Sequence, residues 1–337
     1  MRPVLPIRPI SEVLAELAQN PSPPNLARHS YPGLSPAEIR ALAARDMSTY
    51  TGKVRDVVRH GDELLIVHSD RLTAFDKLIA NVPYKGTILT AISEFWLNEA
   101  KKVVPTHLLG RPHERVLRVE AATPFKVEVI VRGYLAGSMM RAYDKGERVF
   151  CGARLPENLT AYGQLPQAII TPTTKAAAFE HDEDIAPATL ISRGVVTDAE
   201  WREISDMALC LFAHGQKVSR ELGGWLLVDT KYEFGRTKSG AIKVIDEIHT
   251  PDSSRYWVAA TYPERLAAGE APEMLDKEIV RRYLLEQGFS GEGVVPAVPF
   301  DRLAELVQVY LRVAETFTGK PVLTAGPDQT IDVAALL

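Results

Sequence analysis

The sequence predicts an α+β fold, with a small β-rich N-terminal part and a larger α+β part. Two segments, at residues 53–69 and 225–249, are rich in β-branched and apolar residues, and each is interrupted by a turn cluster. Helical periodicity dominates residues 197–222 and returns near the C-terminus. Strands followed by mixed helix and strand favour an α+β enzyme with a cleft between its two parts.

Composition narrows the class of protein. The 337 residues include 39 Lys and Arg against 43 Asp and Glu, a net charge of −4, which argues against a nucleic-acid partner. Two cysteines cannot form a disulfide framework. Apolar runs are too short to span a membrane, and proline and arginine interrupt the first ten residues where a signal peptide is apolar. We therefore expect a cytoplasmic globular protein with no membrane partner. The sequence leaves the oligomeric state open.

Three regions are expected along the chain. Residues 1–48 read as an N-terminal leader or arm. Ser11 is a candidate cap for a short helix over 11–20, and Ser35 caps a second short helix that begins at Pro36. Residues 49–125 form the β-rich part, and residues 126–337 form the α+β part.

The remaining elements follow from local signals. A helix is expected over 88–103, after the first hairpin. Thr197 and Glu200 form a capping box for the longest helix, which ends at Gly223 and Gly224. Residues 151–196 show little periodicity and predict long loops, and helices are expected over 274–287 and 301–316.

The second hairpin carries a pair of carboxylates. If Ser239 and Gly240 form a two-residue turn, Glu233 lies directly opposite Asp246. Like charges in that position repel unless a cation or a shared proton intervenes. Two hard oxygen ligands suit Mg²⁺ that carries substrate phosphates.

A solvated face remains an equal interpretation of this hairpin. Asp229 and Lys231 share the face by the period of two, and Lys231 or Lys243 could neutralise the acids without a metal.

Two basic segments are candidate anion sites. In TGKVRDV, Gly52 permits close backbone approach, and Lys53 and Arg55 project from one strand face. Arg132 offers a planar fork to phosphate, and Ser138 adds a hydroxyl and an N–H to the same anion. An exposed strand entrance and a surface arginine are the plainer interpretations.

The sequence contains no motif for a zinc-binding histidine site or for a serine or cysteine nucleophile. The histidines lack the HExxH spacing, and no GxSxG elbow occurs. Cys151 and Cys210 read as fold residues and not as nucleophiles, because free cysteine usually packs as a small hydrophobe.

Taken together, these segments resemble the SAICAR synthetase family. The resemblance rests on TGKVRDV, DRLTAFD, FKVEVIVRGYLAGS, TPTTKAAAFEHDED, LLVDTKYEFG and VIDEIHTPDSSRYW, in this order, from about Thr51 to the helical C-terminus. The longer loops are similar to those of the family's longer branch.

The resemblance implies an ATP-dependent ligase that joins carboxyaminoimidazole ribonucleotide (CAIR) to L-aspartate through an acyl phosphate, in purine biosynthesis. ATP and Mg²⁺ would be its cofactors, with ATP in the cleft between the two parts. An ATP-dependent small-molecule kinase and a nucleotide-binding regulatory module are the rival interpretations.

The resemblance also implies a role for particular residues. The ATP-binding set is Gly52, Lys53, Arg55, Asp229 and Lys231. Glu233 and Asp246 would hold Mg²⁺ and, with Lys231, form the catalytic set. The substrate-binding set is Arg132, Ser138 and Arg255 for the ribonucleotide phosphate, with Asp76, Lys175 and Asp182 near the substrates.

Overall fold

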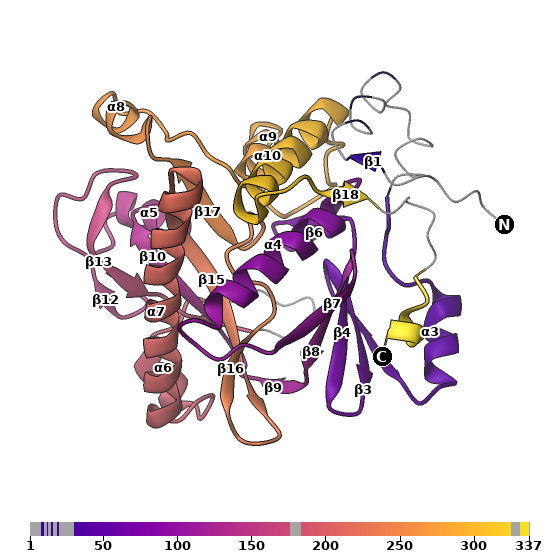
Figure 1. Ribbon diagram of the computed structural model, residues 1–337. Coiled ribbons are helices and arrows are strands. Elements are labelled where there is room, and N and C mark those ends of the chain that lie inside the picture. Colours follow the sequence, from indigo (N-terminus) through magenta and orange to yellow (C-terminus); the bar gives the residue numbers. More distant parts are fainter. Residues whose placement is uncertain are drawn as a thin grey trace. The chain divides into compact units, whose positions relative to one another are not determined.

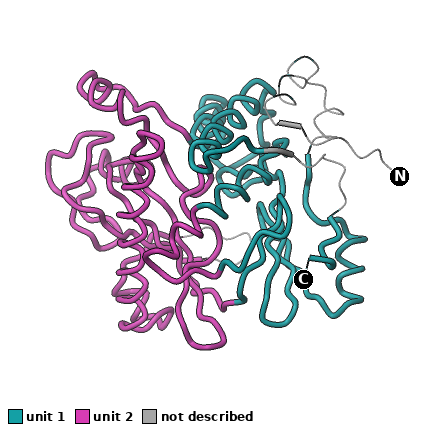
Figure 2. Tube along the Cα trace, viewed as in Figure 1, with its two compact units in different colours: residues 1–95, 108–121, 276–337 teal, residues 96–107, 122–275 magenta. Residues whose placement is uncertain are grey.

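The computed structural model describes residues 8–9, 12, 15, 19, 30–175, 183–324 and 331–336. It has the α+β composition that the sequence predicts. The chain forms two compact units, both discontinuous in sequence (Figure 2). Unit 1 comprises residues 1–95, 108–121 and 276–337, and unit 2 comprises residues 96–107 and 122–275. The C-terminal helices therefore cluster with the N-terminal strands, whereas the sequence grouped them with the second part.

Unit 1 is built around a five-stranded antiparallel sheet in the order β2-β3-β4-β8-β7. Its strands are β2 (Ser48–Thr51), β3 (Arg55–His60), β4 (Glu63–His68), β7 (Leu108–His113) and β8 (Val116–Glu120). Two small pairings are β5 (Arg71–Ala74) with β6 (Lys77–Asn81), and β1 (Arg8–Pro9) with β18 (Leu323–Thr324). The helices are α3 (Pro36–Ala43), α9 (Glu278–Glu286), α10 (Phe300–Thr318), the 3₁₀ turn η1 (Val333–Leu336) and the first part of α4 (Lys85–Ala100).

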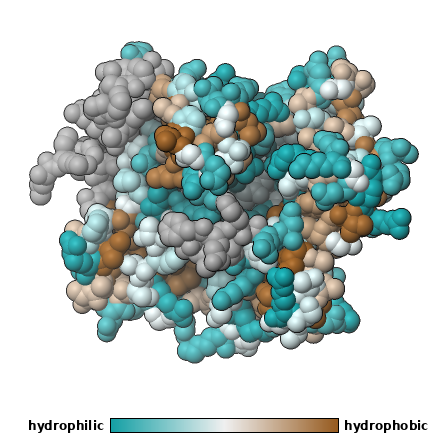
Figure 3. All heavy atoms as spheres, turned by 180° about the vertical axis from the view of Figure 1, so that it is seen from behind, coloured by the Kyte–Doolittle hydropathy of each residue, from teal (hydrophilic) through white to brown (hydrophobic). Residues whose placement is uncertain are grey.

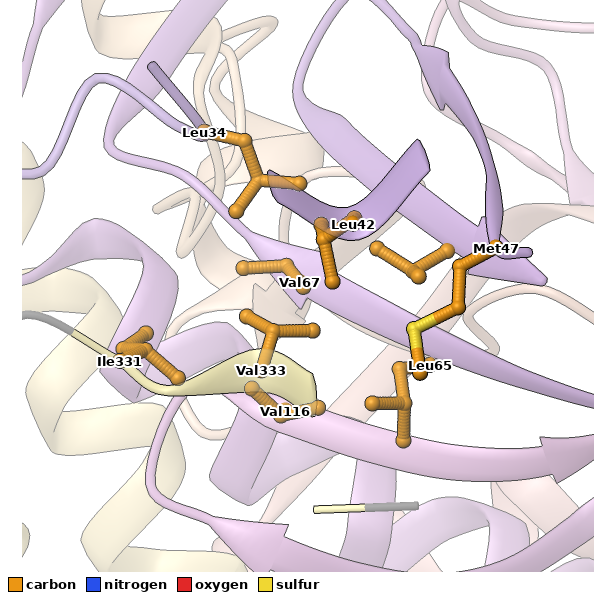
Figure 4. Packing of buried hydrophobic residues seen from close by; sticks show 9 residues of the cluster. Leu34, Leu42, Met47, Leu65, Val67, Val116, Ile331 and Val333 are labelled. Carbon is orange, nitrogen blue, oxygen red and sulfur yellow. The ribbon is translucent and has the colours of Figure 1, made fainter. Parts of the chain in front are cut away.

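The second half of the leader is a packed arm. Ser35 caps α3, as the sequence predicts, and Glu38 completes a capping box with it. Leu42 of α3 and Met47 pack with Leu65 of the sheet and with Val333 from the C-terminal turn (Figure 4). Burying side chains of this size stabilises the fold by about 1.5–3 kcal/mol each. The helix expected near residues 11–20 lies mostly outside the described residues.

The first hairpin is confirmed, with one strand more than expected. Strands β3 and β4 pair in the order that the sequence predicts, from Arg55 opposite His68 to His60 opposite Glu63. Strand β2, which the sequence analysis missed, adds to the outer edge of β3. Lys53 therefore lies in the turn between β2 and β3, and the expectation that it shares a strand face with Arg55 is wrong.

Unit 2 contains a seven-stranded sheet whose main path is β13-β10-β15-β16, with β14 beside β10 and with β9 and β17 beside β15 (Figure 1). Its strands are β9 (Ala122–Pro124), β10 (Val127–Tyr134), β13 (Gln164–Ile170), β14 (Thr173–Thr174), β15 (Trp225–Thr237), β16 (Ile242–Ile245) and β17 (Ser254–Val258). The small pair β11 (Val149–Phe150) and β12 (Ala153–Arg154) lies apart from the sheet. The helices are α5 (Gly137–Asp144), α6 (Pro187–Ser192), α7 (Asp198–Gly223) and α8 (Tyr262–Ala267).

Helix α7 supports this sheet. It contacts β10, β13 and β15 along its length (Figure 1). Thr197 and Glu200 form the predicted capping box, and Gly224 ends the helix in the left-handed conformation at φ 64°. Leu211 and Phe212 are almost fully buried on its inner face. Strand β13 and helix α6 replace part of the long loop expected over residues 151–196.

The register of the second hairpin differs from the prediction by one residue. Gly240 N–H donates to Thr237 O, and Thr237 N–H donates to Ala241 O, so the loop has three residues and ends in a glycine at φ 89°. This is the type I turn with a glycine bulge. Glu233 consequently lies opposite Ile245 and not opposite Asp246.

The surface shows no broad apolar face on the side seen in Figure 3. Hydrophobic residues there form several separate groups among hydrophilic ones. Within the described ranges, we find no helix with the length and apolar character that a membrane crossing requires.

Candidate active site

Strand β15 carries three of the predicted site residues at every second position. Asp229, Lys231 and Glu233 share one face because side chains alternate along a strand. Tyr232, between them, is fully buried on the opposite face. The neighbouring strand β10 pairs with this segment, with Arg132 opposite Asp229 and Ile130 opposite Lys231.

At one end of this face, three charged residues lie side by side on three strands. Arg132 of β10, Asp229 of β15 and Arg255 of β17 are direct cross-strand neighbours, and we call them the arginine row. Arg255 Nη1 donates to Asp229 Oδ2 at 2.8 Å, and Arg132 Nη1 lies 3.5 Å from the same oxygen. One buried carboxylate thus holds two guanidinium groups, which leaves the row with a net positive charge.

Helix α5 begins beside the arginine row. Arg132 Nη2 donates to Ser138 Oγ at 3.2 Å, and Arg132 Nε donates to Thr171 Oγ1 at 2.8 Å. Gly137 has φ 61°, and a Cβ there would lie 2.9 Å from the Arg255 guanidinium. The positive φ favours a glycine at this position, and the missing side chain leaves room for the Arg255 guanidinium. The two arginines and the first turn of α5 form a cradle that suits an anion.

The predicted substrate set for the ribonucleotide phosphate is brought together here. Arg132, Ser138 and Arg255 all belong to the cradle. Asp229, which the resemblance assigns to ATP, is placed by the structure between the two arginines.

Further along the same face lies a carboxylate–lysine cluster, formed by Glu128, Lys175, Lys231, Glu233 and Asp246. Lys231 Nζ donates to Glu128 Oε1 at 2.6 Å and to Glu233 Oε1 at 3.3 Å. Lys175 forms a second ion pair with Glu233. The Glu233 side chain is only 9% exposed, so its charge is largely removed from water.

Asp246 directly follows Ile245, the cross-strand partner of Glu233, and its charge also acts on Lys231. Burial alone would lower the pKa of the Lys231 ammonium, but Glu233, Glu128 and Asp246 outweigh it and raise that pKa above its ordinary value. Asp246 reaches the cluster from a left-handed backbone at φ 64°, directly after β16 ends. Three carboxylates against two ammonium groups leave an excess negative charge.

The cluster fits a magnesium ion that also binds phosphates. Within the described ranges, we find no group of three His, Cys, Asp or Glu side chains arranged as a complete metal site. Mg²⁺ does not require one, because it keeps several waters and binds through one or two carboxylates plus substrate phosphates. Glu233 and Asp246 are the carboxylates that would hold it, and the excess negative charge favours a cation.

Glu128 is a site residue that the sequence analysis missed. Its carboxylate accepts from Lys231 and, at 3.3 Å, from the Thr173 hydroxyl. A signal was present, because Glu128 and Arg132 are four residues apart on one strand and therefore share a face.

The remaining predicted ATP residues lie in unit 1. Gly52 N–H donates to Arg55 O at 2.8 Å, and a Cβ on Gly52 would approach that oxygen to 2.9 Å. Lys53 Nζ forms an ion pair with Asp76 at 2.6 Å, with both side chains about half exposed. An exposed pair of this kind contributes little stability, so Lys53 can exchange Asp76 for a phosphate at low cost. Asp182 lies outside the described residues.

Neither cysteine has the surroundings of a nucleophile. Burial, together with the charge of Asp184, raises the pKa of the Cys151 thiol to about 12, so the thiol stays protonated at neutral pH. Cys210 is exposed on α7.

We therefore expect the double variant Cys151→Ser, Cys210→Ala to keep its catalytic rate within about twofold of the wild type. The check is a steady-state rate, with circular dichroism as the folding control. Loss of activity in a folded double variant, or a covalent cysteine adduct seen by mass spectrometry, would contradict this expectation.

The fold and site define an enzyme that handles phosphorylated small molecules, with an anion cradle and a carboxylate–lysine cluster on one sheet face. A sequence model of the SAICAR synthetase family matches residues 48–298. The chain belongs to the SAICAR synthetase family.

Two named relatives illustrate the likeness. A chloroplastic phosphoribosylaminoimidazole-succinocarboxamide synthase of Arabidopsis thaliana is 42% identical over 291 residues, covering 85% of this chain and 70% of the relative. The synthase of Legionella pneumophila strain Lens is also 42% identical, covering 80% of this chain and 88% of the relative.

Solved structures show the same fold. SAICAR synthase from Saccharomyces cerevisiae, complexed with SAICAR, superposes with a TM-score of 0.70 at 31% identity, covering 82% of this chain and 96% of the yeast chain. A SAICAR synthetase in complex with ADP superposes with a TM-score of 0.63 at 26% identity, covering 81% of this chain and 99% of that one.

Proposed function

We propose that this protein is phosphoribosylaminoimidazole-succinocarboxamide synthase, an ATP-dependent ligase of purine biosynthesis. It condenses CAIR with L-aspartate to SAICAR and releases ADP and phosphate. Family membership supports the reaction, and the yeast and ADP complexes support SAICAR and adenine nucleotide as ligands. A cytoplasmic location completes the proposal.

One observation within this chain carries the proposal. Asp229, in the arginine row, and Glu233, in the carboxylate–lysine cluster, are four residues apart on β15. At roughly 3.3 Å per residue, the two are about 13 Å apart on one face. A ribonucleotide whose phosphate binds the arginine row can therefore extend its base, with the carboxylate, toward the cluster.

The chemistry explains why both ends are needed. A carboxylate is a poor electrophile, so a carboxylate oxygen of CAIR first attacks the γ-phosphorus of ATP, forming an acyl phosphate and ADP. The amine of aspartate then attacks the acyl carbon, loses a proton, and expels phosphate to leave an amide. No covalent nucleophile is required from the protein, because phosphoryl transfer depends mainly on positioning and charge neutralisation.

Each part of the site has a role in this proposal. Bound at Glu233 and Asp246, Mg²⁺ would supply charge neutralisation for the phosphates. Lys231, held by Glu128 and Glu233, presents a fixed ammonium to the transferring phosphoryl group. Gly52, Lys53 and Arg55 in unit 1 complete the proposed ATP-binding set, and Asp76, the partner of Lys53, remains in the proposed substrate set.

Lys175 is proposed to help the enzyme select aspartate as its amine substrate. It is 40% exposed and already bound to Glu233, so its ammonium can also meet the side-chain carboxylate of aspartate. Asp182, from the same segment, would orient the incoming ammonium group. Alanine lacks the second carboxylate and should be a poorer substrate.

Arg132→Lys is expected to raise the KM for CAIR about tenfold while leaving the KM for ATP nearly unchanged. Lysine keeps the charge but loses the fork that now reaches Thr171, Ser138 and Asp229. The measurement is steady-state kinetics with each substrate varied in turn.

Arg148→Lys, an arginine on the surface of the same unit, is the matched control and should leave both constants unchanged. A rise confined to the KM for ATP in Arg132→Lys would place the arginine row in the nucleotide subsite instead.

The test of the proposed function compares ADP release from CAIR and ATP with and without L-aspartate. The ligase should release little ADP until aspartate is added, because an acyl phosphate shielded from water waits for the amine. The product should then carry an amide-linked succinyl group by mass spectrometry. Full-rate ADP release with CAIR alone, and a stable phosphorylated product, would favour a small-molecule kinase.

A further inference from the structure

The back of the active-site strand holds a buried polar pair that the proposed reaction does not use. The Tyr232 hydroxyl hydrogen-bonds His249 Nε2, and both side chains are almost fully buried within unit 2. Burial raises the pKa of the Tyr232 hydroxyl and lowers that of His249 to about 3, so a neutral phenol and a neutral imidazole share this hydrogen bond. Among the described residues, His249 Nδ1 has no hydrogen-bond partner, so the ring depends on Tyr232 for its polar contact.

The short segment that follows β16, from Asp246 to His249, is called the return here. Both residues have left-handed backbones, with φ 64° at Asp246 and φ 55° at His249. Side chains other than glycine disfavour this conformation, and it persists where surrounding contacts determine it. The direction in which Asp246 leaves β16 is therefore set by whatever holds the return in place.

Several contacts hold the His249 end of the return in place, and Glu247 within it accepts from the Thr250 hydroxyl at 2.6 Å. Tyr256 of β17 donates its hydroxyl to His249 O at 2.6 Å, and the Trp96 ring meets the imidazole edge-on at 4.6 Å between centroids. On α7, a Cβ at Gly215 would lie 2.4 Å from the imidazole. A glycine inside a helix costs stability relative to alanine, and the space needed by His249 accounts for it.

Tyr232 links this anchor to the metal-binding face. It is adjacent to Glu233 and Lys231 in β15, and its side chain points to the other face. One hydrogen bond thus ties the strand that carries Glu233 to the return that carries Asp246. We propose that Tyr232 and His249 are positioning residues that hold Asp246 beside Glu233 for metal binding. This inference rests on the metal assignment within the proposed function.

The test is Tyr232→Phe, which removes the hydroxyl and keeps the ring. The affinity for Mn²⁺ is measured in the presence of ADP, from the electron paramagnetic resonance signal of free Mn²⁺. In Tyr232→Phe this affinity should fall about tenfold. Hydrogen exchange of the amides at 246–249 should quicken. Tyr262→Phe is the matched control, because it loses a hydroxyl bond to the Tyr162 carbonyl in the same unit. It should change neither measurement.

A double-mutant cycle separates positioning from general weakening. His249→Gln should weaken Mn²⁺ binding like Tyr232→Phe, and the double variant should be no worse than the poorer single one. Equal Mn²⁺ affinity in Tyr232→Phe and Tyr262→Phe would overturn the inference, even if SAICAR formation by the wild type upholds the function. Absence of Mn²⁺ binding by the wild type would overturn it together with the metal assignment, while the product assay judges the function separately.

Discussion

Glu233→Gln is expected to lower the rate at saturating ATP and CAIR by about 10²- to 10³-fold. The amide keeps the shape of the side chain but removes the charge that would hold Mg²⁺ and that now pairs with Lys175 and Lys231. Asp246→Asn should have a similar effect, and asparagine tolerates the left-handed backbone at this position. The measurement is the rate as a function of Mg²⁺ concentration.

The observed register decides how these variants should change stability. With Glu233 opposite Asp246, removal of one charge would have relieved repulsion. Glu233 instead lies opposite Ile245 and accepts from two lysines, so Glu233→Gln should lower stability by about 1 kcal/mol. Glu157→Gln, which breaks an exposed pair with Arg148, is the control and should change little. Near-normal activity of Glu233→Gln at ordinary Mg²⁺ concentration would refute the metal assignment.

Lys231→Met should also reduce the rate about 10²- to 10³-fold, because it removes the ammonium that we propose faces the transferring phosphoryl group. It should destabilise the apoprotein by about 1–2 kcal/mol, a modest figure for a side chain that is one-third exposed. Thermal melts and steady-state rates measure the two effects.

The pH dependence gives Lys231→Met a distinctive signature. Without the ammonium, the carboxylates of the cluster repel one another, which favours protonation of a carboxyl in the folded state. A carboxyl whose folded pKa is raised binds protons more tightly when folded, so stability should recover as the pH falls toward that pKa. Mg²⁺ should also stabilise this variant more than the wild type. A stability loss that is independent of both pH and Mg²⁺ would contradict the cluster's electrostatics.

Local sequence signals predicted much of the fold. The Ser35 cap followed by Pro36, and the capping box at Thr197, marked helix starts that the structure confirms, because these signals involve residues within three positions of one another. The first hairpin and the long helices are confirmed for the same reason. Strand β2 was missed because its four residues show no clear alternation.

The site was predicted less completely, for a physical reason. Register depends on turn length, and Gly240 fits both a two-residue turn and the three-residue turn that forms. Asp246 joins the cluster through a left-handed residue after the strand ends, which no alternation rule anticipates. The contacts of Asp229 with Arg132 and of Glu128 with Lys231 depend on pairing between strands about a hundred residues apart.

The most direct measurement follows the oxygen atoms of CAIR. With ¹⁸O in both carboxylate oxygens, the acyl-phosphate route predicts one ¹⁸O in each phosphate released, and one in the new amide. The bridging oxygen leaves with phosphorus when the aspartate amine displaces it. Mass spectrometry of phosphate from a reaction with CAIR, ATP and L-aspartate reads the label directly. One ¹⁸O in each released phosphate supports the acyl-phosphate route. Unlabelled phosphate accompanying normal SAICAR formation would contradict it.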